Sequence, residues 1–198
     1  MLSDQEIWGL AERMRVPLVF CNFKDQLKKK PLQYNKSYVV NLENKYDDEG
    51  KRNEGSHYVC FQVNKYPNGK IEPIYFDSFG QPQPDTITDF VGGIMPHNDR
   101  DVQSLMNSAC GWYCLAFLHY INEYQDRTRD LYTDARHFIN MFDDLDKSIN
   151  HIKNEYILKQ FFRSADPALR KTIHVSNGEG VLNANSIIDE NEDKKKHL

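Results

Sequence analysis

The spacing of hydrophobic residues changes once along this chain. Before residue 80, apolar positions form short runs rich in β-branched and aromatic side chains, a composition typical of strands, at about 16–23, 37–42, 57–63 and 71–77. From Cys110 onward, apolar residues recur every three or four positions as far as Ile121. That period predicts a helix over about 110–124 with a wide apolar stripe.

Two of the predicted strands are expected to form a hairpin. Residues 66–70 are Tyr-Pro-Asn-Gly-Lys, and Pro-Asn-Gly is a strong signal for a tight turn between antiparallel strands. In a hairpin, the start of the first strand lies beside the end of the second. Because His57 opens the first strand and Asp77 closes the second, we expect these two residues at the same edge of the sheet.

Capping residues place the other helices. Ser3 and Glu6 form a capping-box pattern at the start of a helix over about 4–13. Ser108 is a candidate N-cap for the long apolar helix. Three further helices are expected, at about 85–90, 130–144 and 149–163.

Together these elements predict an α+β domain over residues 1–178. Its sheet is expected to be small, mixed or antiparallel, and packed against helices, with the helix from Cys110 buried at the centre. The polar residues 24–36 are expected to be irregular. Residues 179–198 are polar, end in Asp-Glu-Asn-Glu-Asp-Lys-Lys-Lys-His-Leu, and are expected to be a mobile tail.

Composition and charge narrow the class of protein. The chain has 198 residues, 39% of them hydrophobic and 27% charged, a balance typical of a soluble globular domain. A net charge of −4 argues against broad electrostatic binding of nucleic acid. No apolar run approaches the ~18 residues of a membrane span, and the first residues lack the pattern of a secretory signal. We therefore expect no membrane association and a reducing compartment.

Two of the four cysteines, Cys110 and Cys114, lie one helical turn apart. A zinc site requires tighter Cys-x-x-Cys spacing and a second ligand pair. Neither stands out in the sequence, so no metal or other cofactor is predicted. Cys110 begins its predicted helix, where unpaired backbone N–H groups and the helix dipole favour a thiolate. Gly111 leaves the approach to the sulfur open, whereas Cys114 falls on the buried stripe. From the helix alone, an ordinary core role explains Cys110 better.

Three other residues supply what a thiol nucleophile needs. His57 is a candidate base, and Asp77 can accept the N–H of one ring nitrogen so that the other faces the sulfur. Gln103 lies seven positions before Cys110, and its amide can join the Cys110 backbone N–H as a donor to an oxyanion. The predicted catalytic set is therefore His57, Asp77, Gln103 and Cys110.

The order of these residues resembles the adenain-like cysteine proteases, meaning the adenovirus maturation protease and its relatives in virophages and polinton-type elements. More remotely, it is similar to the SUMO proteases of the same clan. The resemblance lies within about 57–118 and rests on His-Tyr at 57–58, Phe-Asp-Ser-Phe-Gly at 76–80, Gln103, and Asn-Ser-Ala-Cys-Gly-Trp-Tyr-Cys-Leu at 107–115. It implies a papain-like/adenain-like fold with the nucleophile at the N-terminus of a central helix. Tyr58 stands where the family usually has Trp, and it keeps an aromatic ring to shield the imidazole. Asp77 matches the SUMO proteases, whereas the adenovirus enzyme has Glu.

The resemblance also implies a function. It points to a viral cysteine endopeptidase that cleaves capsid or virion precursor proteins during maturation, at sites containing glycine. Such an enzyme acts in the virion and the infected host cell, and we expect a monomer. The adenovirus enzyme uses DNA and a viral peptide as activators, but the negative net charge here gives a nucleic-acid activator no support. The glycine pair at 92–93 resembles a cleavage site, although a helix stop and turn explain it better.

Three other functions use the same residues or the same fold. A SUMO- or ubiquitin-type isopeptidase has the same triad and differs in its substrate. Bacterial effectors of this clan transfer acetyl groups with a related triad. Gln103 and the close match at 107–111 favour hydrolysis over transfer. A binding module that keeps the fold without catalysis is least favoured, because all four site residues are present.

Overall fold

A four-stranded mixed sheet forms the centre of the molecule. The computed structural model describes residues 1–105, 107–123, 130–145 and 150–165. The strand order is β1-β2-β3-β4, with β1 parallel to β2 and the other neighbours antiparallel. The strands are β1 Leu18–Phe23, β2 Ser37–Asn41, β3 Tyr58–Lys65 and β4 Ile71–Phe76. The predicted α+β class and the predicted hairpin are both confirmed.

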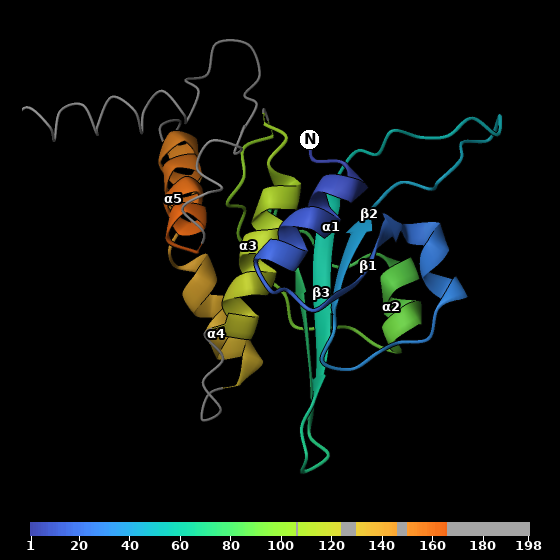
Figure 1. Cartoon of the computed structure of the whole chain (residues 1–198), viewed down its shortest axis with the longest axis horizontal. Helices are drawn as coiled ribbons and strands as arrows, with labels where there is room; N and C mark the ends of the chain where they lie inside the picture. The colour runs from blue at the N-terminus through green and yellow to red at the C-terminus, as the bar shows by residue number, and fades with distance from the viewer. Residues whose placement is uncertain (106, 124–129, 146–149, 166–198) are drawn as a thin grey trace, which may run out of the picture.

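Helices cover both faces of this sheet, which gives three layers (Figure 1). The helices are α1 Asp4–Arg13, the 3-10 helix η1 Lys24–Lys29, α2 Asp85–Val91, α3 Cys110–Glu123, α4 Leu131–Ile139 and α5 Asn150–Ala165. The capping box of α1 is confirmed, since the Ser3 hydroxyl accepts from the Glu6 backbone N–H and the Glu6 carboxylate accepts from the Ser3 N–H. The expectation of irregular chain over 24–36 is wrong for its first part, where η1 buries Leu27.

The two sheet faces carry separate hydrophobic cores. On β3, Tyr58 and Cys60 face α1, α3, α4 and α5, whereas Val59 and Phe61 face the opposite way. The second core is closed by side chains of η1 and α2, among them Ile87. Because both faces are buried, the strands show no alternation of polar and apolar residues.

Helix α3 is the central helix of the domain. Every residue from Cys110 to His119 is buried. The apolar surface is therefore wider than the predicted stripe, because α3 contacts β3 as well as α1, α4 and α5. Figure 1 shows α3 between the sheet and the last two helices. The prediction of a buried central helix is confirmed.

The ends of two helices test the predicted capping. In α3 the Tyr113 N–H bonds to the carbonyl of Ala109 at 3.0 Å, so Ala109 occupies the cap position and the Ser108 N-cap prediction is wrong. The Ser108 hydroxyl instead accepts from the Met1 amino group at 3.1 Å. Gly92 ends α2 in the left-handed conformation, with φ of 83°, which confirms the helix stop.

Residues 179–198, predicted to be a tail, lie outside the described residues. None of the described helices has the length and hydrophobicity to cross a membrane.

Candidate active site

The β3–β4 hairpin brings His57 and Asp77 together. His57 directly precedes β3 and Asp77 directly follows β4, and the pairing nearest to them joins Cys60 to Phe76. The His57 Nε2 lies 2.7 Å from Oδ1 of Asp77. Both side chains are largely buried, with 13% and 2% of their surface exposed. The expectation that they share one sheet edge is confirmed.

The Asp77 carboxylate is held in a fixed orientation. Its Oδ1 also accepts the Phe79 backbone N–H at 2.8 Å. The backbone N–H of Asp77 donates to Oδ1 of Asn98 at 3.1 Å, and its carbonyl accepts from Nδ2 of Asn98. The Asn98 amide therefore binds Asp77 as the peptide group of a neighbouring strand would. Sequence analysis missed Asn98, because its partner lies 21 positions away and no local pattern marks such a contact.

Cys110 is the first residue of α3 and lies beside the His57 ring. Burial lowers the pKa of His57, but hydrogen bonds to Asp77 and to Cys110 outweigh burial and raise that pKa to about 9. The ring is therefore protonated at neutral pH. Because Nε2 binds Asp77, the other ring nitrogen, Nδ1, is the one available to the sulfur. The start of α3 and the His57 ring therefore meet at the Cys110 sulfur.

The other three cysteines are buried free thiols in different surroundings. Burial raises the pKa of Cys114 well above its usual value, and its thiol donates to the Tyr58 carbonyl at 3.4 Å. The Cys60 thiol donates to the Cys114 carbonyl at 3.7 Å. Burial, and then the nearby Asp4 carboxylate, raise the pKa of Cys21. Cys114 therefore lies in the core, as predicted.

Phe79 is the aromatic residue that covers the His57 ring. The two rings are stacked, with centroids 4.4 Å apart and an angle of 23° between their planes. The resemblance gave this shielding role to Tyr58, but the Tyr58 hydroxyl donates to Oδ1 of Asp4 at 2.5 Å. Continuing the hairpin register beyond Cys60 and Phe76 places Phe79 opposite His57. The hairpin predicted from the Pro-Asn-Gly turn was therefore sufficient to indicate this contact.

The buried side chain of Gln103 forms hydrogen bonds to Ser78 and to the loop that leads to Cys110. Its Oε1 accepts from the Ser78 hydroxyl at 2.7 Å, and its Nε2 donates to the Asn107 carbonyl at 3.1 Å. The second N–H of that amide remains for another acceptor. The Asn107 side chain bonds to the Ala109 N–H and to Glu155 of α5. Gln103 thus lies against the loop that ends at Cys110, and its role at an oxyanion stays a prediction.

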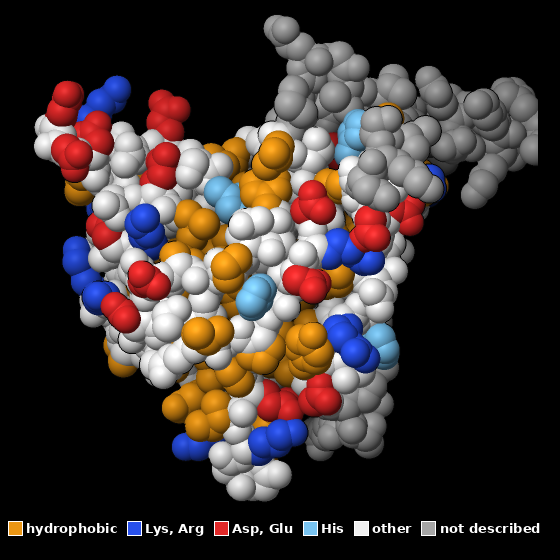
Figure 2. Space-filling model, turned by 180° about the vertical axis from the view of Figure 1, so that it is seen from behind, with side chains coloured by type: hydrophobic (Ala, Val, Ile, Leu, Met, Phe, Trp, Pro, Cys, Tyr) orange, Lys and Arg blue, Asp and Glu red, His pale blue; other side chains and the backbone are white. Residues whose placement is uncertain are grey.

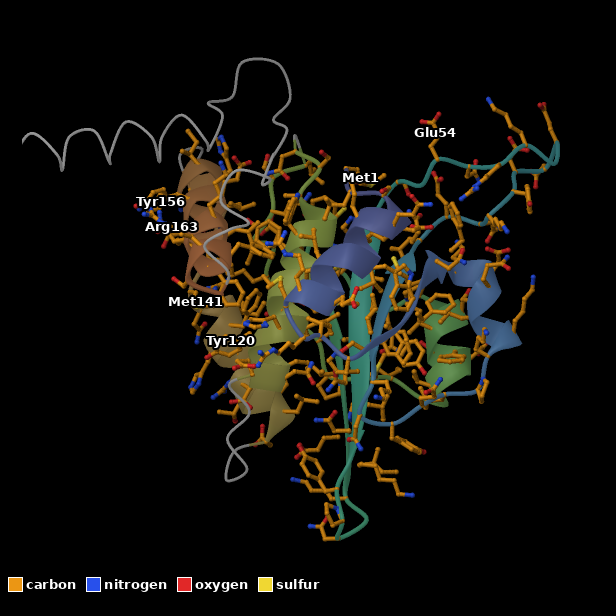
Figure 3. All side chains as sticks on the ribbon, viewed as in Figure 1. Met1, Glu54, Tyr120, Met141, Tyr156 and Arg163 are labelled. Carbon is orange, nitrogen blue, oxygen red and sulfur yellow. The ribbon has the colours of Figure 1, made fainter. Side chains whose placement is uncertain are left out.

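A cavity of about 520 Å³ lies between the N-terminal residues and the segment that precedes β3. It is lined by residues 1–4 and 52–55, Phe23 and Tyr58. Figure 3 shows Met1 and Glu54 at the same end of the molecule, and residues 52–55 end two positions before His57. A Cβ placed on Gly111 would lie 3.3 Å from Leu2. Gly111 therefore allows Leu2 and Ile7 to pack against α3, and its role in opening the approach to the sulfur stays a prediction.

Surface charge and metal-ligand geometry give two further findings. On the face that Figure 2 shows, the Lys and Arg side chains of the described residues are interspersed with Asp and Glu and form no continuous basic patch. Within the described part of the chain, no group of three or more His, Cys, Asp or Glu side chains is arranged to hold a metal ion.

Comparisons with known proteins do not assign a family. No family model matches the chain. No curated protein matches it either. Among solved structures, the chain is similar to HopZ1a, whose structure is titled as a complex with IP6. The identity is 11% and the TM-score 0.37, over 92% of this chain and 76% of HopZ1a. A match of this quality supports no statement about activity, so function depends on the geometry of the site.

Proposed function

We propose that this chain is a cysteine endopeptidase that forms an acyl-enzyme at Cys110. The observation that carries the proposal is the position of His57, which bonds to Asp77 at 2.7 Å through Nε2 and lies beside the Cys110 sulfur at the start of α3. A nucleophile, a base and a group that orients the base are the parts that covalent acyl transfer requires.

In the first half of the reaction, the Cys110 thiolate attacks the carbonyl carbon of the scissile peptide bond and a C–S bond forms. The carbonyl oxygen becomes an oxyanion, which accepts hydrogen bonds from the Cys110 backbone N–H and from Nε2 of Gln103. The protonated Nδ1 of His57 gives its proton to the leaving nitrogen as the C–N bond breaks. The products are a thioester at Cys110 and a free amine.

In the second half, water hydrolyses the thioester. Neutral His57 takes a proton from the water, and the resulting hydroxide attacks the thioester carbon. The C–S bond breaks, releasing the carboxylic acid and restoring the thiolate and the imidazolium. Asp77 accepts the Nε2–H throughout, which keeps the ring in one orientation.

The substrate is proposed from the sequence resemblance and from the shape of the site. The cavity formed by residues 1–4 and 52–55 includes Tyr58, the residue after His57, in its lining, and its volume of about 520 Å³ is enough to hold substrate side chains. We propose virion precursor proteins cut at glycine-containing sites, with the enzyme active as a monomer in the virion and the infected host cell. Glycine suits such sites because it lets the substrate backbone approach the nucleophile closely.

The substrate separates this function from one rival, and the acceptor of the acyl group separates it from the other. Cys110, His57 and Asp77 serve equally in a SUMO- or ubiquitin-type isopeptidase and in an acyltransferase. An isopeptidase uses water as acceptor and a ubiquitin-like protein as substrate. An acyltransferase passes the acyl group to a protein side chain and needs an acyl donor such as acetyl-CoA.

A peptide-library digest read by mass spectrometry tests the proposal. We expect new peptide termini with the wild type and with Cys114→Ala, and none with Cys110→Ala. Cleavage by Cys110→Ala at the wild-type rate would contradict the proposal. Parallel incubations with a ubiquitin-like activity probe and with acetyl-CoA plus a protein mixture distinguish the rivals. Probe capture without library cleavage supports the isopeptidase, and stable acetylation without cleavage supports the transferase.

A further inference from the structure

Two adjacent residues directly after β4 each bind a different member of the candidate catalytic set. Asp77 holds the base, and Ser78 holds Gln103. Ser78 is fully buried, and its hydroxyl donates to Oε1 of Gln103 at 2.7 Å. The Ser78 carbonyl also accepts the backbone N–H groups of Val102 and Gln103, at 2.8 and 3.1 Å. One residue therefore binds both the backbone and the side chain of the Gln103 segment.

The orientation of the Gln103 amide decides what it offers to a substrate. A glutamine amide has one acceptor end and one donor end, and an oxyanion is stabilised only by donors. Nε2 lies 3.1 Å from the Asn107 carbonyl, which can only accept. A flipped amide would place two acceptors against each other there and would leave the Ser78 hydroxyl facing an NH₂ group.

We propose that Ser78 is a positioning residue that keeps the Gln103 amide nitrogen directed at the oxyanion formed beside Cys110. This inference rests on the proposed function. Without the Ser78 hydroxyl, the buried Oε1 of Gln103 loses its donor. The amide is then held only at its nitrogen end, by the Asn107 carbonyl. Its orientation is less tightly fixed, so the oxyanion has a weaker N–H partner while the Cys110–His57 pair stays intact.

The chain contains a matched control for this bond. Ser37 is also fully buried, and its hydroxyl donates to Oε1 of Gln62 at 2.6 Å. This pair lies on β2 and β3, where Gln62 also bonds to Asn64 and Asn122. Ser37→Ala removes the same kind of hydrogen bond from the same depth without touching the candidate active site.

Two reactions of Cys110 separate a role at the oxyanion from general damage to the fold. Alkylation by iodoacetamide needs the thiolate but forms no oxyanion. Acylation by 4-nitrophenyl acetate forms an oxyanion and releases nitrophenolate. We expect Ser78→Ala to leave the alkylation rate of Cys110 unchanged and to lower acylation at least about 10-fold, while Gln103→Ala lowers it about 10²–10³-fold. Because both changes act on one donor, Ser78→Ala/Gln103→Ala is expected to be no slower than Gln103→Ala. Ser37→Ala is expected to leave both rates unchanged.

Three results would overturn the inference: acylation of Ser78→Ala at the rate of Ser37→Ala, a parallel loss of alkylation and acylation in Ser78→Ala, or losses that multiply in the double variant. Failure of the proposed function would give a different result. Cys110→Ala would then be acylated at the wild-type rate, which would show that Cys110 takes no part in the reaction.

Discussion

His57 and Asp77 are 20 positions apart in the chain, and their side chains meet at 2.7 Å across the open end of the β3–β4 hairpin. The hairpin alone sets this contact, because β3 begins where β4 ends. The sulfur comes from a separate unit, the start of α3, which packs against β3. The site therefore exists only when the central helix docks on the sheet.

Removing the charge of Asp77 is expected to impair His57 as a base although the imidazole ring is still present. Asp77→Asn keeps the size of the side chain but removes the charge that favours the imidazolium. We expect kcat/KM for peptide cleavage to fall by about 10² or more, and its alkaline limb to move to lower pH. Glu72→Gln is the control, since Glu72 pairs with Lys70 near the far end of β4. An unchanged pH profile in Asp77→Asn would contradict the assigned role.

The raised pKa of His57 predicts a pH dependence of both activity and stability. The ring is protonated through neutral pH, so kcat/KM is expected to decline as pH rises through about 9. A folded-state pKa above the unfolded value means that the charged ring stabilises the fold. That contribution, up to about 3 kcal/mol, is fully present below pH 6.5 and is lost as pH rises through about 9. Urea unfolding of the wild type and His57→Ala measures it. A difference in unfolding free energy that stays constant from pH 6 to pH 10 would contradict the shift.

Phe79, and not Tyr58, is expected to hold the His57 ring in its orientation by stacking on it. Phe79→Ala removes the stacked ring, lets the imidazole rotate, and is expected to lower kcat about 10-fold. Phe79→Tyr keeps the stacking and is expected to retain activity. Tyr58→Phe keeps the ring, removes the bond to Asp4, and is expected to leave kcat near the wild-type value. Steady-state peptide cleavage checks all three variants, and a kcat of Phe79→Ala equal to that of the wild type would contradict the assignment.

Gly80 is expected to be irreplaceable in the turn that follows Asp77. Its φ is +68°, and an added Cβ would lie 2.7 Å from the backbone of Arg100. Gly50 is the matched control, because its φ is +78° with no atom near the added Cβ. We expect Gly50→Ala to cost about 1 kcal/mol of unfolding free energy and Gly80→Ala about 3 kcal/mol or more. Urea unfolding measures both. Equal losses would show that the contact with Arg100 does not constrain this turn.

The sequence predicted the elements of the site whose signals are local. The Pro-Asn-Gly turn placed His57 and Asp77 together, and the change of hydrophobic period located the start of α3 within a residue. The order of the four site residues along the chain then indicated that the β3–β4 hairpin and the start of α3 belong to one site.

The residues that hold this set could not be predicted, because their roles depend on tertiary contacts. Ser78 and Asn98 bond to segments 25 and 21 positions away. Glu155 reaches Asn107 from α5 across 48 positions. Polar residues of these types are common on surfaces, so burial and a specific partner distinguish them only in the folded chain.

The central claim, that Cys110 is a nucleophile activated by His57, is tested most directly by labelling with iodoacetamide across pH. Mass spectrometry reads the modification at each of Cys21, Cys60, Cys110 and Cys114, in the wild type and in His57→Ala. We predict that Cys110 alone labels rapidly near neutral pH and that the rate collapses in His57→Ala. Labelling of Cys110 no faster than that of Cys114, or labelling indifferent to His57, would contradict the account and leave Cys110 as a packing residue of α3.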